Sequence, residues 1–375
     1  MQGTERTSLP GKGTLPMSEA SISVIVPVHD GGQAFCNCLL ALTTTEPAPG
    51  EIIVVTDGDT DHSRAIAETF GVRVLNTSTR VGPAQARNLG ACAAQGDILF
   101  FLDADVLVPP DIIAQVRVLF GQEPDLTAVF GSYDDEPAEG NFVSQYKNLF
   151  HHYVHQTSRQ EASTFWAGCG AIYRNAFLSV GGFDANYDRP AIEDIELGYR
   201  LTRAGYRIRL GKTLQVKHLK RWTALSLLKT DFFCRALPWT DLILRDHRFI
   251  NDLNLQYNSR ISVALTLGFL CAILGAWWWN EFLPAAAVAL LLLLALNLPL
   301  YHFFLHQRGL WFTLRAIPWH WLYYFYSGLA FALGVIHYLV ENKPGPACRM
   351  AENGCGIKLE AEGNCAEPKY RVCVS

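Results

Sequence analysis

Three long segments without an Asp, Glu, Lys or Arg occupy the last third of the chain. They read ISVALTLGFLCAILGAWWW (261–279), AAAVALLLLLALNLPLYHFFL (285–305) and AIPWHWLYYFYSGLAFALGVIHYLV (316–340). Each reaches the roughly 20 residues that a helix needs to span hydrocarbon, and Trp and Tyr gather near the ends. Buried helices of a large soluble core have a similar composition. Three such segments in succession favour a membrane domain over residues 259–340 with three transmembrane helices.

The loops between these segments predict the orientation of the chain. Arg308 and Arg315 lie between the second and third segments, whereas Asn280-Glu281, between the first and second, includes no basic residue. Because cytoplasmic loops carry the excess of Lys and Arg, we expect residues 1–258 to be cytoplasmic. The chain is then a multi-pass protein of the cell (inner) membrane.

The same orientation puts the C-terminal tail, residues 341–375, outside the membrane. The gaps between its cysteines do not match the C-x-x-C pairs of zinc sites; these are Cys348, Cys355, Cys365 and Cys373. Two disulfides are expected if this tail meets an oxidising compartment, and none if it is only a disordered end, and both alternatives stay open. The scattered cysteines of the N-terminal part are expected to be reduced; these are Cys36, Cys38, Cys92 and Cys169.

Length and charge restrict the remaining possibilities. The chain has 375 residues, enough for about two domains, and its net charge of −4 does not suggest a nucleic-acid-binding protein. Residues 1–20 are rich in Gly, Pro, Ser and Thr and lack the apolar region of a secretory signal. We therefore expect a disordered N-terminal tail.

Residues 21–105 alternate between strand-like and helix-like segments. The strand-like segments are near-continuous apolar runs, at 21–30, 51–57, 72–76 and 97–105, and the helix-like segments lie between them at 33–44, 64–71 and 82–95. Continuous apolar strands alternating with helices are typical of a parallel sheet covered on both faces. The fold class is therefore α/β, with a mostly parallel sheet between helices.

Polar residues follow three of these strands. His29 and Asp30 follow the first, Asp57 to Asp61 follow the second, and Asp103 and Asp105 follow the apolar run ILFFL. Ligands of such sheets bind beyond the carboxyl ends of the strands. Asp also closes strands simply by satisfying turn backbone. Two carboxylates two residues apart form a hard oxygen site, and the convergence of three strand ends favours Mg²⁺ or Mn²⁺ there.

Two further features lie between residues 191 and 258. Glu193 and Asp194 begin an amphipathic helix, where acids often only compensate the helix dipole. The run 200–221 has eight Lys or Arg and no acid, and it is suited to anionic lipid headgroups or to a pyrophosphate. Apolar and basic residues then alternate over 223–258, which favours interfacial amphipathic helices near the bilayer; ordinary packed helices are the alternative.

Five segments together resemble the family-2 glycosyltransferases, inverting enzymes of the nucleotide-diphospho-sugar transferase (GT-A) fold. In chain order they are VIVPVHD, VVTDGDTDHS, ARNLGACAAQGDILFFLDAD, GCGAIYRNAFLSVGGFD and EDIELGYRLTRAG, and they cover about residues 21–222. Thr56 and Asp59 depart from the family's V-V-D-D-G-S-T-D turn. A sixth segment, HLKRW (218–222), resembles the Q-x-x-R-W motif of processive synthases, but His218 replaces Gln, which argues against processivity.

The resemblance implies a role for each matching residue. On the donor side, Pro27 lies in the first motif, His29 packs on the nucleobase, Asp57 binds the nucleobase, and Arg87 supports the phosphates. Asp105 binds the metal, Mg²⁺ or Mn²⁺, and Asp103 shares the metal or holds the ribose.

The matching residues of the second half handle the acceptor and the leaving group. Asp194 is the catalytic base with Glu193 beside it, and Arg221 holds the diphosphate. Gly168, His218 and Trp222 lie on the acceptor side.

The implied function is transfer of a sugar from a nucleotide-diphospho-sugar to a lipid or lipid-linked acceptor at the membrane, with no nucleic acid involved. A polysaccharide synthase subunit and a nucleotidyltransferase of similar fold are the alternatives within this fold. A transporter or a scaffold with an inactive enzyme domain is the alternative outside it.

Overall fold

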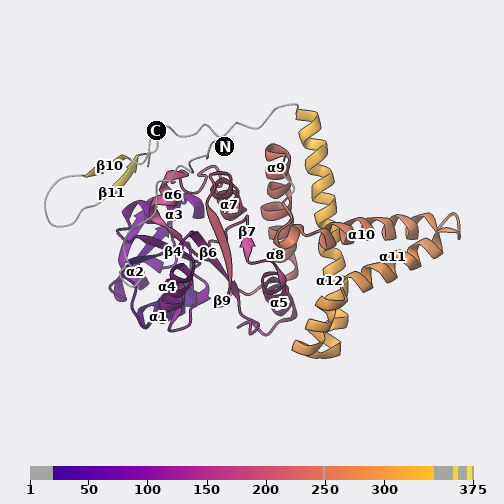
Figure 1. Ribbon diagram of the computed structural model, residues 1–375, viewed down its shortest axis with the longest axis horizontal. Helices are drawn as coiled ribbons and strands as arrows, with labels where there is room; N and C mark the ends of the chain where they lie inside the picture. The colour runs from indigo at the N-terminus through magenta and orange to yellow at the C-terminus, as the bar shows by residue number, and fades with distance from the viewer. Residues whose placement is uncertain (1–19, 248–249, 342–357, 362–369, 374–375) are drawn as a thin grey trace, which may run out of the picture.

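The computed structural model describes residues 20–247, 250–341, 358–361 and 370–373. Nearly all of the predicted N-terminal tail, and most of the predicted C-terminal tail with Cys348, Cys355 and Cys365, lie outside the described residues. The tail contributes a separate antiparallel pair, β10 (Lys358–Ala361) and β11 (Tyr370–Cys373). Figure 1 shows a sheet domain on one side, a long helix beside it, and a helical hairpin that projects away from both.

A nine-stranded mixed sheet forms the core of the N-terminal domain, in the order β3-β2-β1-β4-β8-β6-β9-β5, with β7 beside β9. Strands β1 to β4 are parallel, whereas β8 runs antiparallel to both β4 and β6. The predicted mostly parallel sheet is therefore confirmed for β1 to β4 and for β6 with β9. It is mixed because β8 lies antiparallel between β4 and β6. The strands are β1 (Ile22–Val28), β2 (Glu51–Asp57), β3 (Arg73–Thr77), β4 (Ile98–Leu102), β5 (Val106–Leu107), β6 (Leu126–Tyr133), β7 (Glu161–Ala162), β8 (Cys169–Tyr173) and β9 (Arg207–His218).

Helices cover both faces of this sheet, and each face has its own apolar cluster. Alternate side chains of one strand enter opposite clusters, as Phe100 and Phe101 of β4 do, because successive side chains point to opposite faces of a sheet. Both aromatic side chains are fully buried. The helices are α1 (Gly32–Thr43), α2 (Ser63–Thr69), α3 (Pro83–Ala93), α4 (Ile112–Gln122), α5 (Phe142–Thr157), α6 (Arg174–Ser179) and α7 (Glu193–Arg203).

The C-terminal helices follow the predicted order but differ in their bounds. They are α8 (Ala224–Lys229), η1 (Thr230–Ala236), α9 (Leu237–Asp246), η2 (Leu253–Leu255), α10 (Tyr257–Gly275), α11 (Phe282–Leu296) and α12 (Leu298–Glu341). Two described helices, α10 and the 298–340 part of α12, are long and apolar enough to cross a membrane. The predicted segment 285–305 is not one helix, because α11 ends at Asn297 and a new helix begins at Leu298.

Asn297 interrupts that segment because it joins three helices. Its amide nitrogen donates to the Ser262 hydroxyl of α10 at 3.0 Å and to the Leu293 carbonyl of α11 at 2.9 Å. Its carbonyl oxygen accepts from the Tyr324 hydroxyl of α12 at 2.8 Å. A buried polar side chain needs hydrogen-bond partners. The three hydrogen bonds of Asn297 therefore fix how the α10–α11 hairpin leaves α12.

The predicted redox state of the N-terminal cysteines is confirmed at three positions and wrong at one. Cys36, Cys38 and Cys169 are free thiols. Cys92, on α3, is in a disulfide, and its partner is not among the side chains that the structure describes. No pattern around Cys92 distinguishes it from the other scattered cysteines.

Candidate active site

His29 and Asp57 lie together where β1 and β2 end. The Nδ1 atom of His29 is 2.8 Å from the backbone oxygen of Asp57. The buried Asp57 carboxylate accepts hydrogen bonds from the backbone N–H groups of Val81 (2.6 Å) and Gly82 (2.9 Å), and from the Thr77 hydroxyl (3.1 Å). Asp57 therefore holds the loop that leads into α3. Its predicted nucleobase contact stays a prediction, as do the donor-side roles of His29 and of Pro27 within β1.

Arg87 of α3 connects the two predicted halves of the site. Its side chain is buried, and its Nη2 atom donates to Asp103 Oδ1 while its Nη1 atom donates to Glu193 Oε1, both at 2.8 Å. Burial opposes the charge, but Asp103, Glu193 and Asp194 outweigh it and raise the pKa of Arg87. Both terminal nitrogens are thus committed to carboxylates. The predicted role of Arg87 in supporting the phosphates stays a prediction.

Asp103 and Asp105 directly follow β4, as the apolar run ILFFL predicts. The Asp103 backbone N–H donates to the Gly168 carbonyl at 3.2 Å, which joins this strand end to the loop before β8. Asp105 Oδ2 lies 3.7 Å from the His218 Nε2 atom. Burial alone would raise the pKa of Asp105, but His218 and Lys220 outweigh it, and the pKa lies below its ordinary value. Asp105 is therefore a stable anion.

This pair of carboxylates can be tested as a metal site by its donor chemistry. Among the described residues, no three His, Cys, Asp or Glu side chains form a group that could hold a metal ion. The Asp103 and Asp105 side chains are 32% and 30% exposed, so oxygen atoms of both remain accessible. Mg²⁺ in phosphate sites binds one or two carboxylates and takes its other ligands from phosphates and water. Two residues of this kind fit such an ion.

Asp194 lies in the first turn of α7, beside the loop before β8. Its Oδ2 atom accepts from the Ala167 N–H at 3.2 Å. Burial, followed by the neighbouring Glu193 carboxylate, raises the pKa of Asp194 to about 7, against the opposing effect of Arg87. Glu193 is engaged through both oxygens, with Arg87 on one and the Ala191 N–H on the other. Of the two acids, Asp194 has the pKa that suits a base at neutral pH.

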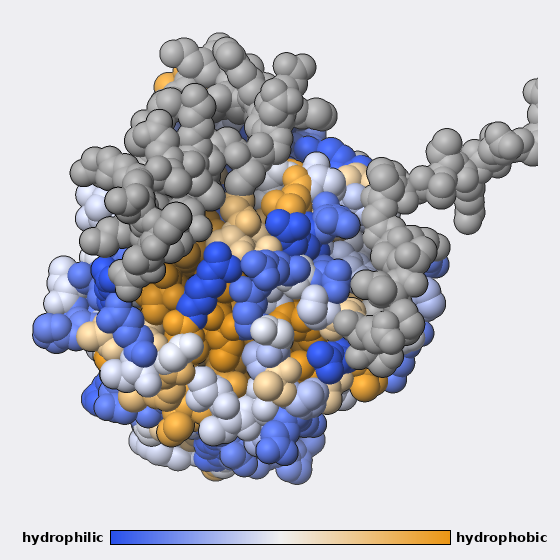
Figure 2. Space-filling view, turned by 90° about the vertical axis from the view of Figure 1, so that its left-hand side faces the viewer, coloured by the Kyte–Doolittle hydropathy of each residue, from blue (hydrophilic) through white to orange (hydrophobic). Residues whose placement is uncertain are grey.

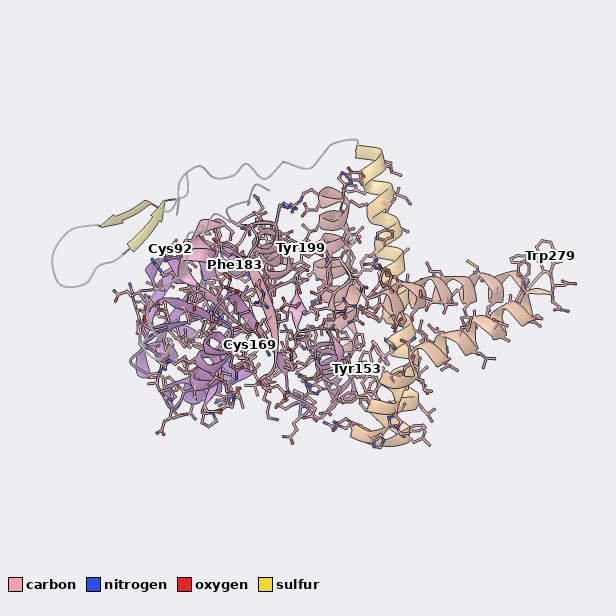
Figure 3. The ribbon with its side chains drawn as sticks, in the orientation of Figure 1. Cys92, Tyr153, Cys169, Phe183, Tyr199 and Trp279 are labelled. Carbon is pink, nitrogen blue, oxygen red and sulfur yellow. The ribbon has the colours of Figure 1, made fainter. Side chains whose placement is uncertain are left out.

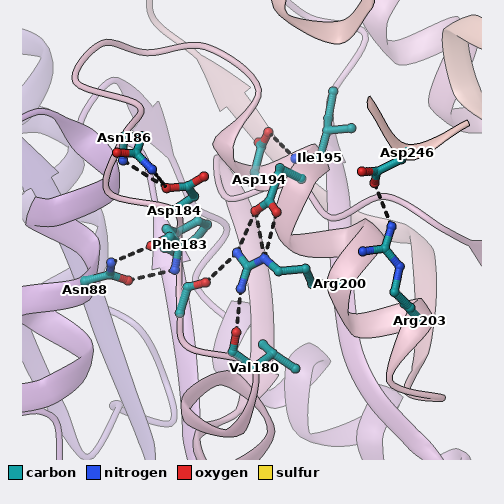
Figure 4. Close-up of polar contacts among 12 residues, drawn as sticks. Asn88, Val180, Phe183, Asp184, Asn186, Asp194, Ile195, Arg200, Arg203 and Asp246 are labelled. Atoms are coloured by element: carbon teal, nitrogen blue, oxygen red, sulfur yellow. Dashed lines mark hydrogen bonds and ion pairs between the residues drawn. The ribbon is translucent and has the colours of Figure 1, made fainter. Parts of the chain in front are cut away.

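A hydrogen-bonded frame positions α7 and α3 around this acid, as Figure 4 shows. Arg200 donates to the Glu196 carboxylate and to the carbonyls of Val180 and Gly182, the latter two at 2.6 Å. Asn88 of α3 exchanges two hydrogen bonds with the Phe183 backbone. The loop 180–184 is thereby tied to both helices, and the distance between Arg87 and Asp194 is set by rigid elements.

The remaining predicted acceptor and diphosphate residues are placed less centrally. The Arg221 side chain is 72% exposed, with Glu139 3.9 Å away. Trp222 is buried in an apolar cluster with α5 and α12, and its backbone bonds Ser144 and Asn141. The buried Gly168 permits a close approach, because a Cβ there would meet the Trp166 ring at 2.6 Å.

An aromatic wall beside His218 was not predicted. The Tyr133 ring stacks on His218 with centroids 4.1 Å apart and contacts His151 and Trp166 at 4.4 and 4.9 Å. Nδ1 of His151 is buried and has no hydrogen-bond partner among the described residues. The triple-histidine segment HHYVH (151–155) was the available signal, but helical spacing alone does not separate core histidines from site histidines.

Arg235 of η1 was predicted only as part of an interfacial helix. Its guanidinium is held by the Asp231 carboxylate at 3.1 Å. Burial lowers its pKa, but Asp231, Tyr133 and Asp194 outweigh that effect and raise it. Arg235 is thus a cation close to the acidic site, and it comes from the segment that precedes the apolar helices α10 to α12.

Comparisons with known proteins agree with this geometry. Residues 23–181 match the family model described as glycosyl transferase family 2. Glycosyltransferase GlyG of Streptococcus pneumoniae is 35% identical over 132 residues, which are 34% of this chain and 43% of that protein. An uncharacterized glycosyltransferase of Haemophilus influenzae is 32% identical over 132 residues, 34% of this chain and 52% of that protein. The matches thus span about half of these relatives or less.

Among solved structures, the mannosyltransferase PcManGT from Pyrobaculum calidifontis, in complex with GDP-Man and Mn²⁺, is similar in fold. The TM-score is 0.52 at 16% sequence identity, and the match covers 86% of this chain and 88% of that chain. At this identity the likeness concerns the fold alone. Residues 23–181 therefore match glycosyl transferase family 2, and the sheet domain around them has the GT-A fold.

Proposed function

We propose that this protein is a membrane-bound, metal-dependent glycosyltransferase that moves a sugar, with inversion, from a nucleotide-diphospho-sugar to a lipid or lipid-linked acceptor. One observation carries the proposal: Arg87 bridges Asp103, at the end of β4, to Glu193, at the start of α7. This bridge links the strand end of the predicted donor side to the helix on which the predicted base Asp194 lies, which supports one shared site. The nucleotide-sugar donor is also in keeping with the GDP-Man held by the similar mannosyltransferase.

The donor half of the site suits a diphosphate. Asp105 and Asp103 would hold Mg²⁺ or Mn²⁺, which supplies charge stabilisation for the departing nucleoside diphosphate. His29 and Asp57 lie at the neighbouring strand ends, where the nucleotide of such a sheet belongs. Lys220 and the exposed Arg221 lie on the segment after β9 and supply positive charge to this edge.

The acceptor half suits proton removal from a hydroxyl group. A hydroxyl is a poor nucleophile, and a positioned base with a pKa near the working pH removes its proton most effectively. Asp194 meets this requirement with a pKa of about 7. Attack from the face opposite the leaving group forms the new glycosidic bond as the old bond to the phosphate oxygen breaks, and it inverts the anomeric carbon.

The C-terminal helices support a lipid acceptor. Two of them are long and apolar enough to cross a membrane, and η1 brings Arg235 from that region to the acidic site. A site joined this closely to apolar helices is suited to an acceptor whose hydroxyl or phosphate lies at the bilayer surface. We accordingly place the protein in the cell (inner) membrane, with the catalytic domain in the cytoplasm.

Identification of donor and acceptor is the direct experiment. Membranes that contain the protein are incubated with a panel of nucleotide sugars, and lipid extracts are compared by mass spectrometry with extracts from an Asp194→Asn control. The proposal expects one lipid to gain the mass of one sugar only with active protein. If no lipid gains the mass of a sugar and a soluble molecule gains it instead, the proposal of a lipid acceptor is wrong.

A further inference from the structure

The α10–α11 hairpin projects away from the catalytic domain and is apolar on all sides. Figure 1 shows it leaving α12 on the side opposite the sheet, and Figure 3 places Trp279 at its far end. Among its apolar side chains, large exposed ones face every direction: Ile261, Leu270, Ile273, Leu274, Val288, Leu291 and Leu292. The tip consists of Trp277, Trp278 and Trp279, which are 86%, 70% and 62% exposed. Tryptophan at the end of such a hairpin is typical of a membrane interface.

The other apolar helix, α12, has a different environment. It lies against the catalytic domain along most of its length, and Phe312 contacts Phe142 of α5 while Gly334 packs against Thr240 of α9. Between these points, the Tyr326 hydroxyl donates to Asp231 of η1 at 2.8 Å. From Phe312 to Gly334 the helix runs about 33 Å, which exceeds the roughly 30 Å of hydrocarbon in a bilayer.

Both ends of this contact are polar. Before the non-helical residue Gly309, Gln307 donates to the Asp135 carboxylate at 2.9 Å, and Arg308 donates to Gln145 at 2.7 Å. At the other end, α9 contains Asp241, Arg245 and Asp246 close to the Gly334 contact. A crossing α12 would carry one of these polar regions through the hydrocarbon, where charged side chains are strongly disfavoured.

The outward face of α12 is apolar. Phe325, Leu329, Ile336 and Val340 are 37%, 40%, 57% and 76% exposed. Their spacing of four, seven and four residues puts them on one stripe of a helix. One face of α12 thus packs against protein, and the opposite face is apolar and exposed. This pattern is typical of a helix that lies in the plane of the membrane interface.

From these observations we infer that only the α10–α11 hairpin enters the bilayer, whereas α12 lies along the membrane surface with its stripe at 325–340 in contact with lipid. Both ends of α12 are then on the side of the catalytic domain. This arrangement departs from the predicted three spans and places the start of the C-terminal tail on the cytoplasmic side. It also puts the catalytic domain flat against the headgroups, with Arg235 between the lipid and the acidic site.

Depth measurements on the full chain in lipid vesicles test the inference. A spin label, introduced as an unnatural amino acid, is placed singly at Phe325, Leu329, Ile336 and Val340, and its depth is read from relaxation by oxygen and by a water-soluble nickel complex. We expect all four labels to lie within about 5 Å of one depth, near the headgroup boundary. All four side chains are partly or largely exposed, and none belongs to the buried core.

The hairpin supplies the matched control. Labels at Ile261, Leu270 and Leu274 should become progressively deeper, by about 20 Å over thirteen residues. The inference is overturned if the α12 labels also change in depth by about 20 Å from Phe325 to Val340, which is a crossing helix. It is equally overturned if all four α12 labels are accessible only from water.

A sidedness assay gives a second, independent readout. A short epitope is inserted after Glu341 in one variant and at the exposed Ala48 of the catalytic domain in another. In sealed vesicles of either orientation, we expect protease to reach both epitopes or neither. If protease cleaves only one of the two epitopes, the end of α12 and the catalytic domain lie on opposite sides of the membrane. This result overturns the inference.

Discussion

Asp194 owes its chemistry to its neighbours rather than to its position in the sequence. Acids at a helix start commonly only compensate the helix dipole, and the pair Glu193-Asp194 alone does not reveal which of the two forms an ion pair. Both oxygens of Asp194 accept from backbone N–H groups, those of Ala167 and Ile195. The structure separates them, because Arg87 and the Ala191 N–H engage Glu193, whereas burial and Glu193 raise the pKa of Asp194 to about 7. The raised pKa of Asp194 matches what a base at neutral pH requires.

Replacement of Asp194 by Asn should separate catalysis from donor binding. The amide is nearly the same size but cannot accept the proton of the acceptor hydroxyl, and loss of general-base help costs about two to four orders of magnitude in rate. Donor affinity should stay near that of the wild type, since Asp103 and Asp105 are untouched. Transfer assays beside titration calorimetry with the nucleoside diphosphate check both. Near-wild-type turnover would mean that the base is another residue, with Glu193 and Asp188 the next to test.

The raised pKa of Asp194 also predicts the pH dependence. Only the ionised carboxylate is a base, so kcat/KM should fall about tenfold for each pH unit below about 7 and level off above it. The folded pKa lies above the unfolded value of about 3.9. The stability that Asp194 contributes is therefore complete below that value and is lost as the pH rises through 7.

Two measurements check these signs. A pH–rate profile should show the inflection near pH 7, and a flat profile between pH 5 and 8 would contradict Asp194 as the base. In thermal unfolding, the Asp194→Asn variant should lose less stability than the wild type as the pH rises from 5 to 8.

Asp105→Ala should give the opposite pattern to Asp194→Asn. Removing one of the two carboxylates at the end of β4 should weaken binding of the metal and of the nucleotide sugar, because the diphosphate is held through both. Excess chelator should abolish transfer by the wild type, and Mg²⁺ or Mn²⁺ should restore it. Full activity in excess chelator is the result that would exclude the metal. Calorimetric titration of the nucleoside diphosphate, with and without Mn²⁺, measures the loss.

At the scale of elements, the strands and helices up to β4 follow from the sequence. The apolar runs of β1 and β4 are almost entirely buried and polar residues follow them, so burial and site point to the same boundaries. The edge strand β3 is only partly buried. The antiparallel β8 did not follow, because nothing in CGAIY reveals the direction of a strand. The break at Asn297 was missed because one Asn in an apolar run signals nothing until Ser262 and Tyr324 are placed beside it.

The contact between η1 and α5 predicts a large stability effect. The Lys147 ammonium donates to both oxygens of the buried Asp231 at 2.8 Å, and burial lowers the pKa of Lys147 to about 8 against the opposing effect of that carboxylate. Asp231→Leu leaves Lys147 buried without its partner, which typically costs about 3–5 kcal/mol.

The double variant Lys147→Met/Asp231→Leu is the matched control. It removes the buried ammonium together with its carboxylate and should recover part of the stability, because an apolar pair often replaces a buried ion pair without loss. The rest stays lost because Arg235 and Tyr326 also lose their contact with Asp231. Unfolding in detergent, followed by tryptophan fluorescence, compares the three proteins. A loss below about 1 kcal/mol in the single variant would mean that the ion pair does not hold η1 in place.

At the scale of the whole molecule, the sheet domain and the long apolar helix α12 pack against each other. Figure 2, which views the molecule from the end away from the hairpin, shows a mostly hydrophilic outline with hydrophobic residues near its centre. The exposed apolar surface of the hairpin lies at the opposite end. The sequence predicts that both parts exist, but not that α12 lies against the catalytic domain. Contacts such as Phe312 with Phe142 join residues 170 positions apart, and no local pattern reports them.

The central claim is that the protein transfers a sugar to a lipid and releases a nucleoside diphosphate. Its most direct test supplies purified protein, in vesicles of native lipids, with a donor labelled in the sugar and Mn²⁺, and measures the label in the organic phase together with the nucleotide product. We predict that lipid-bound label and nucleoside diphosphate appear in equal amounts. Release of pyrophosphate would contradict this function. Release of nucleoside diphosphate while all of the label stays in the aqueous phase as free sugar would contradict it as well.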